Sequence, residues 1–147
     1  MRYLAIDLGG KRTGLASGDD VTGIVQPLTV VEAAPGDHLL RLLQREIDRF
    51  GPDALVVGLP LNMDGTEGPS AAAVRAFAGR IGAACGVEVR FQDERLTSFA
   101  AEGHLERSGR THREKKEIRD ALAAAEILRD HLRERGTRAE GSETSEE

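Results

Sequence analysis

The order of strand-like and helical segments along the chain limits its fold more than any other feature. Three strand-like segments come first, joined by glycine-rich turns, at residues 2–7, 13–17 and 24–32. Helices and strands then alternate: helix 37–50, strand 54–58, helix 70–85, strand 87–92, and two helices over 97–107 and 114–135. This order predicts an α/β fold. An antiparallel three-strand meander and two parallel strands would form a five-stranded mixed sheet flanked by helices.

Composition and charge narrow the class of protein. Hydrophobic residues make up 39% of the 147 residues but aromatic residues only 3%, so the core must be aliphatic. Cys85 has no second cysteine to pair with, and the start of the chain is too polar for a signal peptide. No apolar run approaches the ~20 residues of a membrane span. We therefore expect a cytoplasmic protein.

The net charge of −5 is concentrated at the end of the chain. Residues 139–147 contain four glutamates and no base, and without them 21 acidic residues face 20 basic ones. The rest of this stretch is mostly Gly, Ser and Thr, which is typical of a disordered tail. We expect one domain over residues 1–138 and a disordered acidic tail over residues 139–147.

Three carboxylates occupy positions that a sheet could bring together. Asp7 ends the first strand, Glu94 follows the fifth strand, and Asp120 lies near the start of the last helix, before a run rich in alanine. The first and fifth strands can end at the same side of the sheet. An alanine face lets the helix pack closely across that edge, so we expect Asp7, Glu94 and Asp120 to meet. Taken singly, each has an ordinary explanation: a tight turn, a surface pair with Arg95, or an acid near a helix start.

Carboxylates gathered in this way repel one another unless a cation lies between them. Oxygen ligands favour Mg²⁺ or Mn²⁺, and two such ions can activate water against a phosphodiester. We therefore expect Asp7, Glu94 and Asp120 to be catalytic metal ligands, with two ions when substrate is bound. Gly9 and Gly10 would allow the backbone close to the site, and Lys11 and Arg12 would contact nucleic-acid phosphates.

Four stretches resemble the YqgF family, also called RuvX or Holliday-junction-resolvase-like proteins: DLGGKRTGLA (7–16), VVGLPLNMDGTEGP (56–69), FQDERLTS (91–98) and DALAAAEIL (120–128). The resemblance implies a ribonuclease H-like fold and a nuclease that matures the precursor of 16S ribosomal RNA. It also places the family's catalytic acids on Asp7, Glu94 and Asp120. Related resolvases have a further ligand at the offset of Glu117, which leaves open whether Glu117 is a fourth ligand. The chain departs from the family pattern at Gln92 and Arg119.

Further positions could bind the substrate. A basic stretch, residues 107–119, has six bases against two acids and could follow phosphates. The polar loop 60–69 could donate hydrogen bonds, and Arg95 could touch a phosphate. The candidates, besides Lys11 and Arg12, are Asn62, Thr66, Arg95, Arg110, Arg113, Lys115 and Lys116. Each could equally be part of a plain loop or a solvated helix face.

Several functions fit this pattern. The leading hypothesis is a metal-dependent endonuclease acting on structured RNA, such as precursor ribosomal RNA or a ribosomal particle. Cleavage of branched DNA junctions would use the same fold and acids, and would require a dimer. A kinase of the actin–hexokinase type needs two such domains, and this chain has room for one. A non-catalytic RNA- or ribosome-binding module is the remaining alternative, and metal-dependent cleavage would exclude it. The sequence leaves monomer or dimer open.

Overall fold

The computed structural model describes residues 1–94 and 112–146, with side chains over 1–94 and 118–135. A five-stranded sheet lies at its centre, in the order β3-β2-β1-β4-β5. β1 (Arg2–Leu8), β2 (Thr13–Asp19) and β3 (Val25–Val31) form the antiparallel meander. β4 (Ala54–Leu59) pairs parallel with β1, and β5 (Glu88–Asp93) pairs parallel with β4. The predicted mixed sheet is confirmed, with strand ends displaced by one or two residues.

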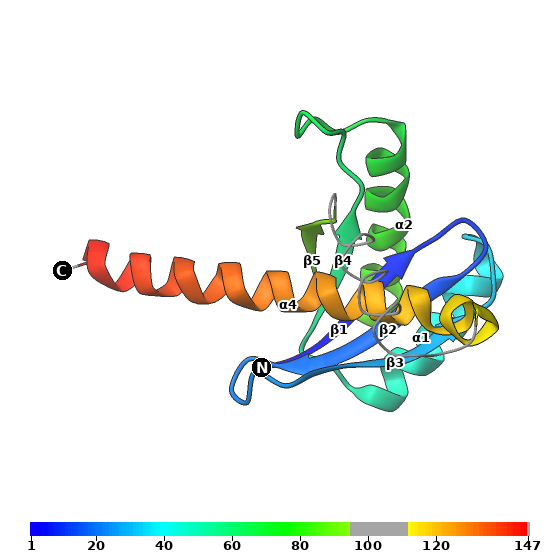
Figure 1. The fold of residues 1–147 in the computed structure, drawn as a ribbon, viewed down its shortest axis with the longest axis horizontal. Coiled ribbons are helices and arrows are strands. Elements are labelled where there is room, and N and C mark those ends of the chain that lie inside the picture. Colours follow the sequence, from blue (N-terminus) through cyan, green and yellow to red (C-terminus); the bar gives the residue numbers. More distant parts are fainter. Residues whose placement is uncertain (95–111, 147) are drawn as a thin grey trace.

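Helices cover both faces of the sheet (Figure 1). α1 (Asp37–Phe50) and α2 (Pro69–Cys85) pack on one face, where leucine, isoleucine and valine side chains of the helices and of β1 and β4 form an aliphatic core. Both helices end at a glycine with positive φ, Gly51 at 67° and Gly86 at 66°. This left-handed conformation suits glycine, so the predicted helix ends are confirmed.

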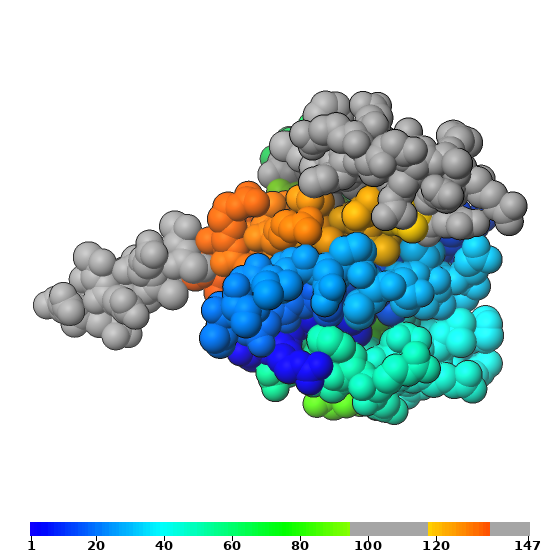
Figure 2. All heavy atoms as spheres, turned by 60° about the horizontal axis from the view of Figure 1, so that its bottom comes forward, coloured from blue at the N-terminus to red at the C-terminus, as the bar shows by residue number. Residues whose placement is uncertain are grey.

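α4 (His112–Glu146) lies across the other face and contacts all five strands. In the space-filling view its described side chains, yellow to orange, lie directly on the blue strands of the meander (Figure 2). Three of the sheet residues beneath it are alanines, Ala5, Ala16 and Ala54, and they belong to one buried cluster with Ala124 and Ala125 of the helix. Small side chains on both partners allow the helix axis to approach the sheet closely, as the alanine-rich sequence predicted.

Gly14 of β2 marks the closest approach of the helix. A Cβ built on Gly14 would overlap the backbone carbonyl of Asp120 and lie 2.7 Å from the amide nitrogen of Ala121. Real Cβ atoms do not tolerate such contacts, so only glycine permits this crossing. The backbone of α4 is therefore held against β2 at the residue that bears a candidate catalytic carboxylate.

α4 is longer than predicted at both ends. His112 and Arg113, which precede the predicted helix start at residue 114, form its first turn, and its backbone continues helical to Glu146. It thus includes most of the stretch expected to be a disordered tail, and its last turns extend beyond the sheet (Figure 1). The domain boundary at residue 138 stays a prediction. The predicted helix 97–107 lies outside the described residues. No described helix has both the length and the apolar character needed to cross a bilayer.

Candidate active site

Asp7 and Glu94 lie on the face of the sheet that α4 covers. In β1, Tyr3 and Ala5 belong to the core beneath α4, and side chains alternate along a strand, so Asp7 points to the same face. Glu94 directly follows β5, and its backbone N–H donates to the carbonyl oxygen of Leu59 at 3.3 Å. A Cβ on Gly58 would lie 2.5 Å from Oε2 of Glu94 and from Cδ1 of Ile127. The glycine in β4 therefore makes room for the Glu94 carboxyl group under the helix.

The carboxyl groups of Asp7 and Glu94 are joined by a hydrogen bond. Burial raises the pKa of Glu94 to about 8, and the Asp7 charge, this hydrogen bond and the Asp93 charge act in the same direction. Burial also raises the pKa of Asp7, as does the charge of Asp120, whereas the bond from Glu94 lowers it. The two carboxyl groups therefore share a proton at neutral pH, and Glu94 is the group whose pKa is raised above 7.

Asp120 lies near this pair but is held by a base. Its Oδ2 is 3.4 Å from Nε of Arg12, in an ion pair between side chains that are 24% and 31% exposed. Burial raises the pKa of Asp120, and the positive charges of Arg12 and Arg119 oppose the rise. Asp120 is close enough for its charge to raise the pKa of Asp7. The predicted meeting of carboxylates is thus seen as a hydrogen-bonded pair with a third acid beside it.

The carboxylate oxygens of Asp7, Glu94 and Asp120 are the type of ligand that hard divalent cations prefer. The Asp7–Glu94 pair keeps a proton because two buried carboxylates without a cation between them do not both ionise. Over residues 1–94 and 118–135, no three acidic, histidine or cysteine side chains already stand as a metal-binding group. The carboxylate oxygens therefore suit Mg²⁺ or Mn²⁺ in kind, and the ligand role of Asp120 stays a prediction.

The turn between β1 and β2 places the predicted phosphate-binding bases. The N–H of Gly9 donates to the carbonyl oxygen of Arg12 at 3.0 Å, and a Cβ on Gly9 would overlap that carbonyl. Gly10 has nothing near its Cβ position, so the structure supports a steric need for glycine at the first position only. Lys11 is exposed at the tip of this turn.

Asn62 and Thr66 form hydrogen bonds inside the loop between β4 and α2. Nδ2 of Asn62 donates to Oγ1 of Thr66 at 3.0 Å, and Oγ1 of Thr66 donates to Oδ1 of Asp64 at 2.6 Å. The Asn62 N–H also donates to the Thr66 carbonyl oxygen at 2.8 Å. These contacts shape the loop, and the predicted role of both side chains in substrate binding stays a prediction.

The side chains of the other predicted site residues lie outside the described part of the structure. Arg95 and Arg110 lie outside the described residues. Arg113, Lys115, Lys116 and Glu117 belong to the first turns of α4, where only the backbone is described. Glu117 lies three residues before Asp120 on that helix, so its role as a fourth ligand stays a prediction.

Residues 1–134 match the model of the family described as RuvX: Holliday junction resolvase. The chain belongs to this family. Relatives named "Putative pre-16S rRNA nuclease" include one from Anaeromyxobacter sp. (strain Fw109-5), 46% identical over 90% of this chain and 96% of its own. Another, from Escherichia coli O139:H28, is 40% identical over 88% of this chain and 94% of its own. The resemblance predicted from the four sequence motifs is confirmed.

Two solved structures share the fold of this RuvX-family protein. RuvC of T. thermophilus, in complex with a Holliday junction substrate, has a TM-score of 0.59 at 19% identity, over 93% of this chain and 96% of its own. The fowlpox virus Holliday junction resolvase also has a TM-score of 0.59, at 13% identity, over 91% of this chain and 99% of its own. These likenesses confirm the ribonuclease H-like architecture.

The sequence analysis missed two glycines and one ion pair at the site of this RuvX-family protein. Gly58 makes room for Glu94, Gly14 seats Asp120, and Arg12 pairs with that carboxylate. A signal was present for the glycines, since glycine inside a strand often marks a close approach of another segment. The pairing of Arg12 had no signal in the sequence, because its partner lies more than a hundred residues away.

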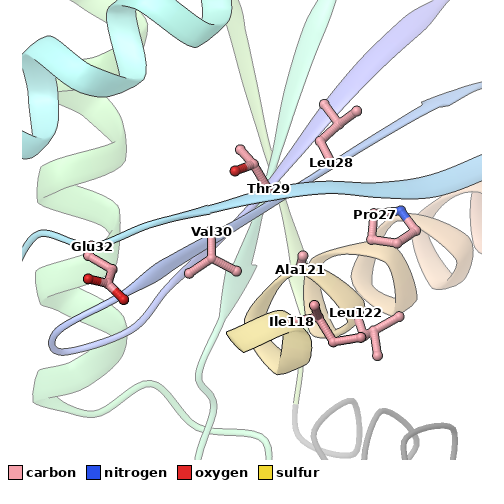
Figure 3. Close-up of a pocket in the computed structure, with 8 residues that line it drawn as sticks. All are labelled: Pro27, Leu28, Thr29, Val30, Glu32, Ile118, Ala121 and Leu122. Atoms are coloured by element: carbon pink, nitrogen blue, oxygen red, sulfur yellow. The ribbon is translucent and has the colours of Figure 1, made fainter. Parts of the chain in front are cut away.

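A separate groove of about 510 Å³ lies between β3 and α4. Its walls are mainly apolar, with Pro27, Leu28 and Val30 on the strand and Ile118 and Leu122 on the helix (Figure 3). Glu32 is the acid among its lining residues. With one carboxylate, the groove lacks the ligand set of the candidate active site.

Proposed function

We propose that this protein is a metal-dependent endonuclease that hydrolyses phosphodiester bonds in structured RNA. The observation that supports it most is the buried, hydrogen-bonded Asp7–Glu94 pair with Asp120 beside it, at the edge of a ribonuclease H-like sheet. Membership of the RuvX family and relatives named as nucleases support the same chemistry. The names of those relatives favour the precursor of 16S ribosomal RNA as substrate. A protein that acts on this RNA would work in the cytoplasm.

Asp7, Glu94 and Asp120 would hold Mg²⁺ or Mn²⁺. The bound ions would lower the pKa of the attacking water and stabilise the leaving oxygen. The protein's own part begins with the proton shared by Asp7 and Glu94, which must leave before both carboxylates can act as ligands. Burial of the pair keeps these oxygens partly shielded from water and so strengthens their interaction with positive charge.

The turn between β1 and β2 would bring the substrate to the acids. Lys11 is exposed at its tip, and Arg12 already lies at the carboxylate edge through its ion pair with Asp120. Both bases would contact backbone phosphates, with Arg95 and the basic stretch of residues 107–119 extending the contact surface. Asn62 and Thr66 would support the substrate through the loop that they close.

The decisive experiment compares the parent protein with Asp7→Asn on two substrates. Precursor 16S ribosomal RNA and a four-way DNA junction are incubated in parallel with Mn²⁺, Mg²⁺ or a chelator, under single-turnover conditions. We expect cleavage of the RNA by the parent with metal, and a loss of roughly a hundredfold or more for Asp7→Asn, because a ligand and its charge are removed. RNA affinity should change little, since most of it comes from bases contacting phosphates.

Other outcomes select other functions. Preferential, paired cuts in the DNA junction would favour a resolvase, which the description of the family names. Binding of RNA without cleavage under any metal condition would indicate a non-catalytic RNA- or ribosome-binding module. An Asp7→Asn protein that cuts at the parental rate would remove Asp7 from the site and refute the proposed mechanism.

A further inference from the structure

The position of Arg12 is set by the backbone of its turn. The Gly9 N–H donates to the Arg12 carbonyl oxygen at 3.0 Å, and no side chain larger than that of glycine fits at residue 9. Thr13, the next residue, begins β2 and is fully buried. Arg12 therefore leaves a closed turn and a buried strand, and its backbone has little freedom to shift.

The position of Asp120 is set by the same strand. The α4 backbone touches β2 at Gly14, and the contact is made by the carbonyl group of Asp120 itself. Gly14 is two residues after Arg12, so one segment of chain positions both members of the ion pair. This differs from an ion pair between two long side chains on an open surface, which gains little because both must be ordered.

Asp120 consequently faces two possible partners. The negative charge of Asp120 raises the pKa of Asp7, while its Oδ2 lies 3.4 Å from Nε of Arg12. Arg119 also acts on Asp120 through its charge, but it is exposed and acts more weakly than Arg12. Among the described side chains, the carboxylates do not yet stand as a three-ligand group. One oxygen of the Asp120 carboxylate, Oδ2, therefore lies against the Arg12 guanidinium.

We propose that Arg12 is a positioning residue that holds Asp120 in the metal-free protein and passes to a substrate phosphate when the cation binds. This inference rests on the proposed nuclease function. A guanidinium and a divalent cation would compete for one carboxylate, so Arg12 weakens cation binding in the absence of nucleic acid. A phosphate matches the fork of the guanidinium and removes that competition. Cation and nucleic acid then favour each other's binding by the same factor.

The test measures Mn²⁺ binding by isothermal titration calorimetry, without nucleic acid. Arg12→Gln removes the charge and keeps a polar side chain, and Lys11→Gln removes one charge at the neighbouring exposed position. We expect Arg12→Gln to bind Mn²⁺ roughly five- to tenfold more tightly than the parent, because a competing charge has been removed. Lys11→Gln should stay within about twofold. Arg12→Lys, which keeps the charge, should restore weak binding.

A second measurement follows binding of a short RNA hairpin in chelator at several salt concentrations. Both glutamine variants should bind the RNA more weakly, and each should reduce the slope of log affinity against log salt by about one. Only Arg12→Gln should then combine tighter Mn²⁺ binding with weaker RNA binding. A residue with a merely structural role would not shift the two affinities in opposite directions.

The outcomes separate this inference from the function on which it rests. If Asp7→Asn weakens Mn²⁺ binding while Arg12→Gln leaves it at the parental value, the metal site stands and the role of Arg12 is overturned. If Arg12→Gln and Lys11→Gln raise the Mn²⁺ affinity equally, the increase comes from the overall positive charge of the turn, and the specific role of Arg12 is again overturned. If Mn²⁺ binding is absent, or is the same in Asp7→Asn as in the parent, the metal site itself fails and the inference fails with it.

Discussion

Glu94→Gln should stabilise the metal-free protein, and increasingly so as the pH rises. Burial raises the pKa of Glu94 from its ordinary 4.5 to about 8, so folded Glu94 keeps a proton that the unfolded chain releases near pH 4.5. Between these values the folded state binds more protons, and its stability falls as the pH rises. Glutamine has no proton to lose, and its amide can still donate to Asp7.

The size of the effect follows from the raised pKa. For each pH unit above 4.5, the free energy of unfolding of the parent falls by about 1.4 kcal/mol, until Glu94 ionises near pH 8. At pH 7 the upper limit is about 3 kcal/mol, and sharing of the proton with Asp7 reduces it to roughly 2 kcal/mol. For a domain of this size, that difference corresponds to an increase in melting temperature of roughly 5–10 °C.

The assay is thermal unfolding in chelator at several values between pH 5 and pH 9, for the parent and Glu94→Gln. The two melting temperatures should be close at pH 5 and separate progressively towards pH 8. Glu32→Gln serves as a control, because it removes the same charge from an exposed position, and its difference from the parent should stay constant. A gap between parent and Glu94→Gln that does not change with pH, or a variant that is less stable throughout, would refute the reasoning. Added Mn²⁺ should stabilise the parent more than the variant.

Three further predictions test the packing, the nucleic-acid interface and the tail. Gly14→Ala should destabilise the protein by roughly 2–4 kcal/mol in denaturant titration, because the new methyl group displaces α4, whereas Gly10→Ala should stay within about 0.5 kcal/mol. A combined variant that neutralises Arg110, Arg113, Lys115 and Lys116 should show a weaker dependence of log RNA affinity on log salt. An unchanged slope would exclude the basic stretch as the contact surface. Deleting residues 139–147 should leave the melting temperature unchanged, and a drop of several degrees would show that these residues dock on the body.

The sequence by itself was sufficient for the strands of the sheet, because its signals are local. Apolar runs, turn glycines and the helical spacing of α1 depend on neighbours a few residues away, and they predicted an antiparallel meander and two parallel strands. The order of the strands in the sheet, and the pairing of β4 with β1 and of β5 with β4, came from the structure. The same local patterns placed Asp7 and Glu94 at the ends of two predicted strands. Because β1, β4 and β5 run parallel, Asp7 and Glu94 lie at the same end of the sheet, where the C-terminal ends of these strands meet. In the structure the two carboxyl groups are joined by a hydrogen bond.

Only the tertiary structure decided which groups the site residues bind. The sequence predicted a phosphate contact for Arg12, which stays a prediction; that α4 crosses β2 at Gly14 and brings Oδ2 of Asp120 to 3.4 Å from Nε of Arg12 came from the structure. Asn62 and Thr66 are hydrogen-bonded to each other within their loop, a contact that the sequence did not predict, and their binding of substrate stays a prediction. The raised pKa of Glu94 depends on burial beneath α4, which arrives from the far end of the chain. These properties depend on where distant segments touch, and a local pattern specifies which residues form a helix or strand but not which distant charge will face them.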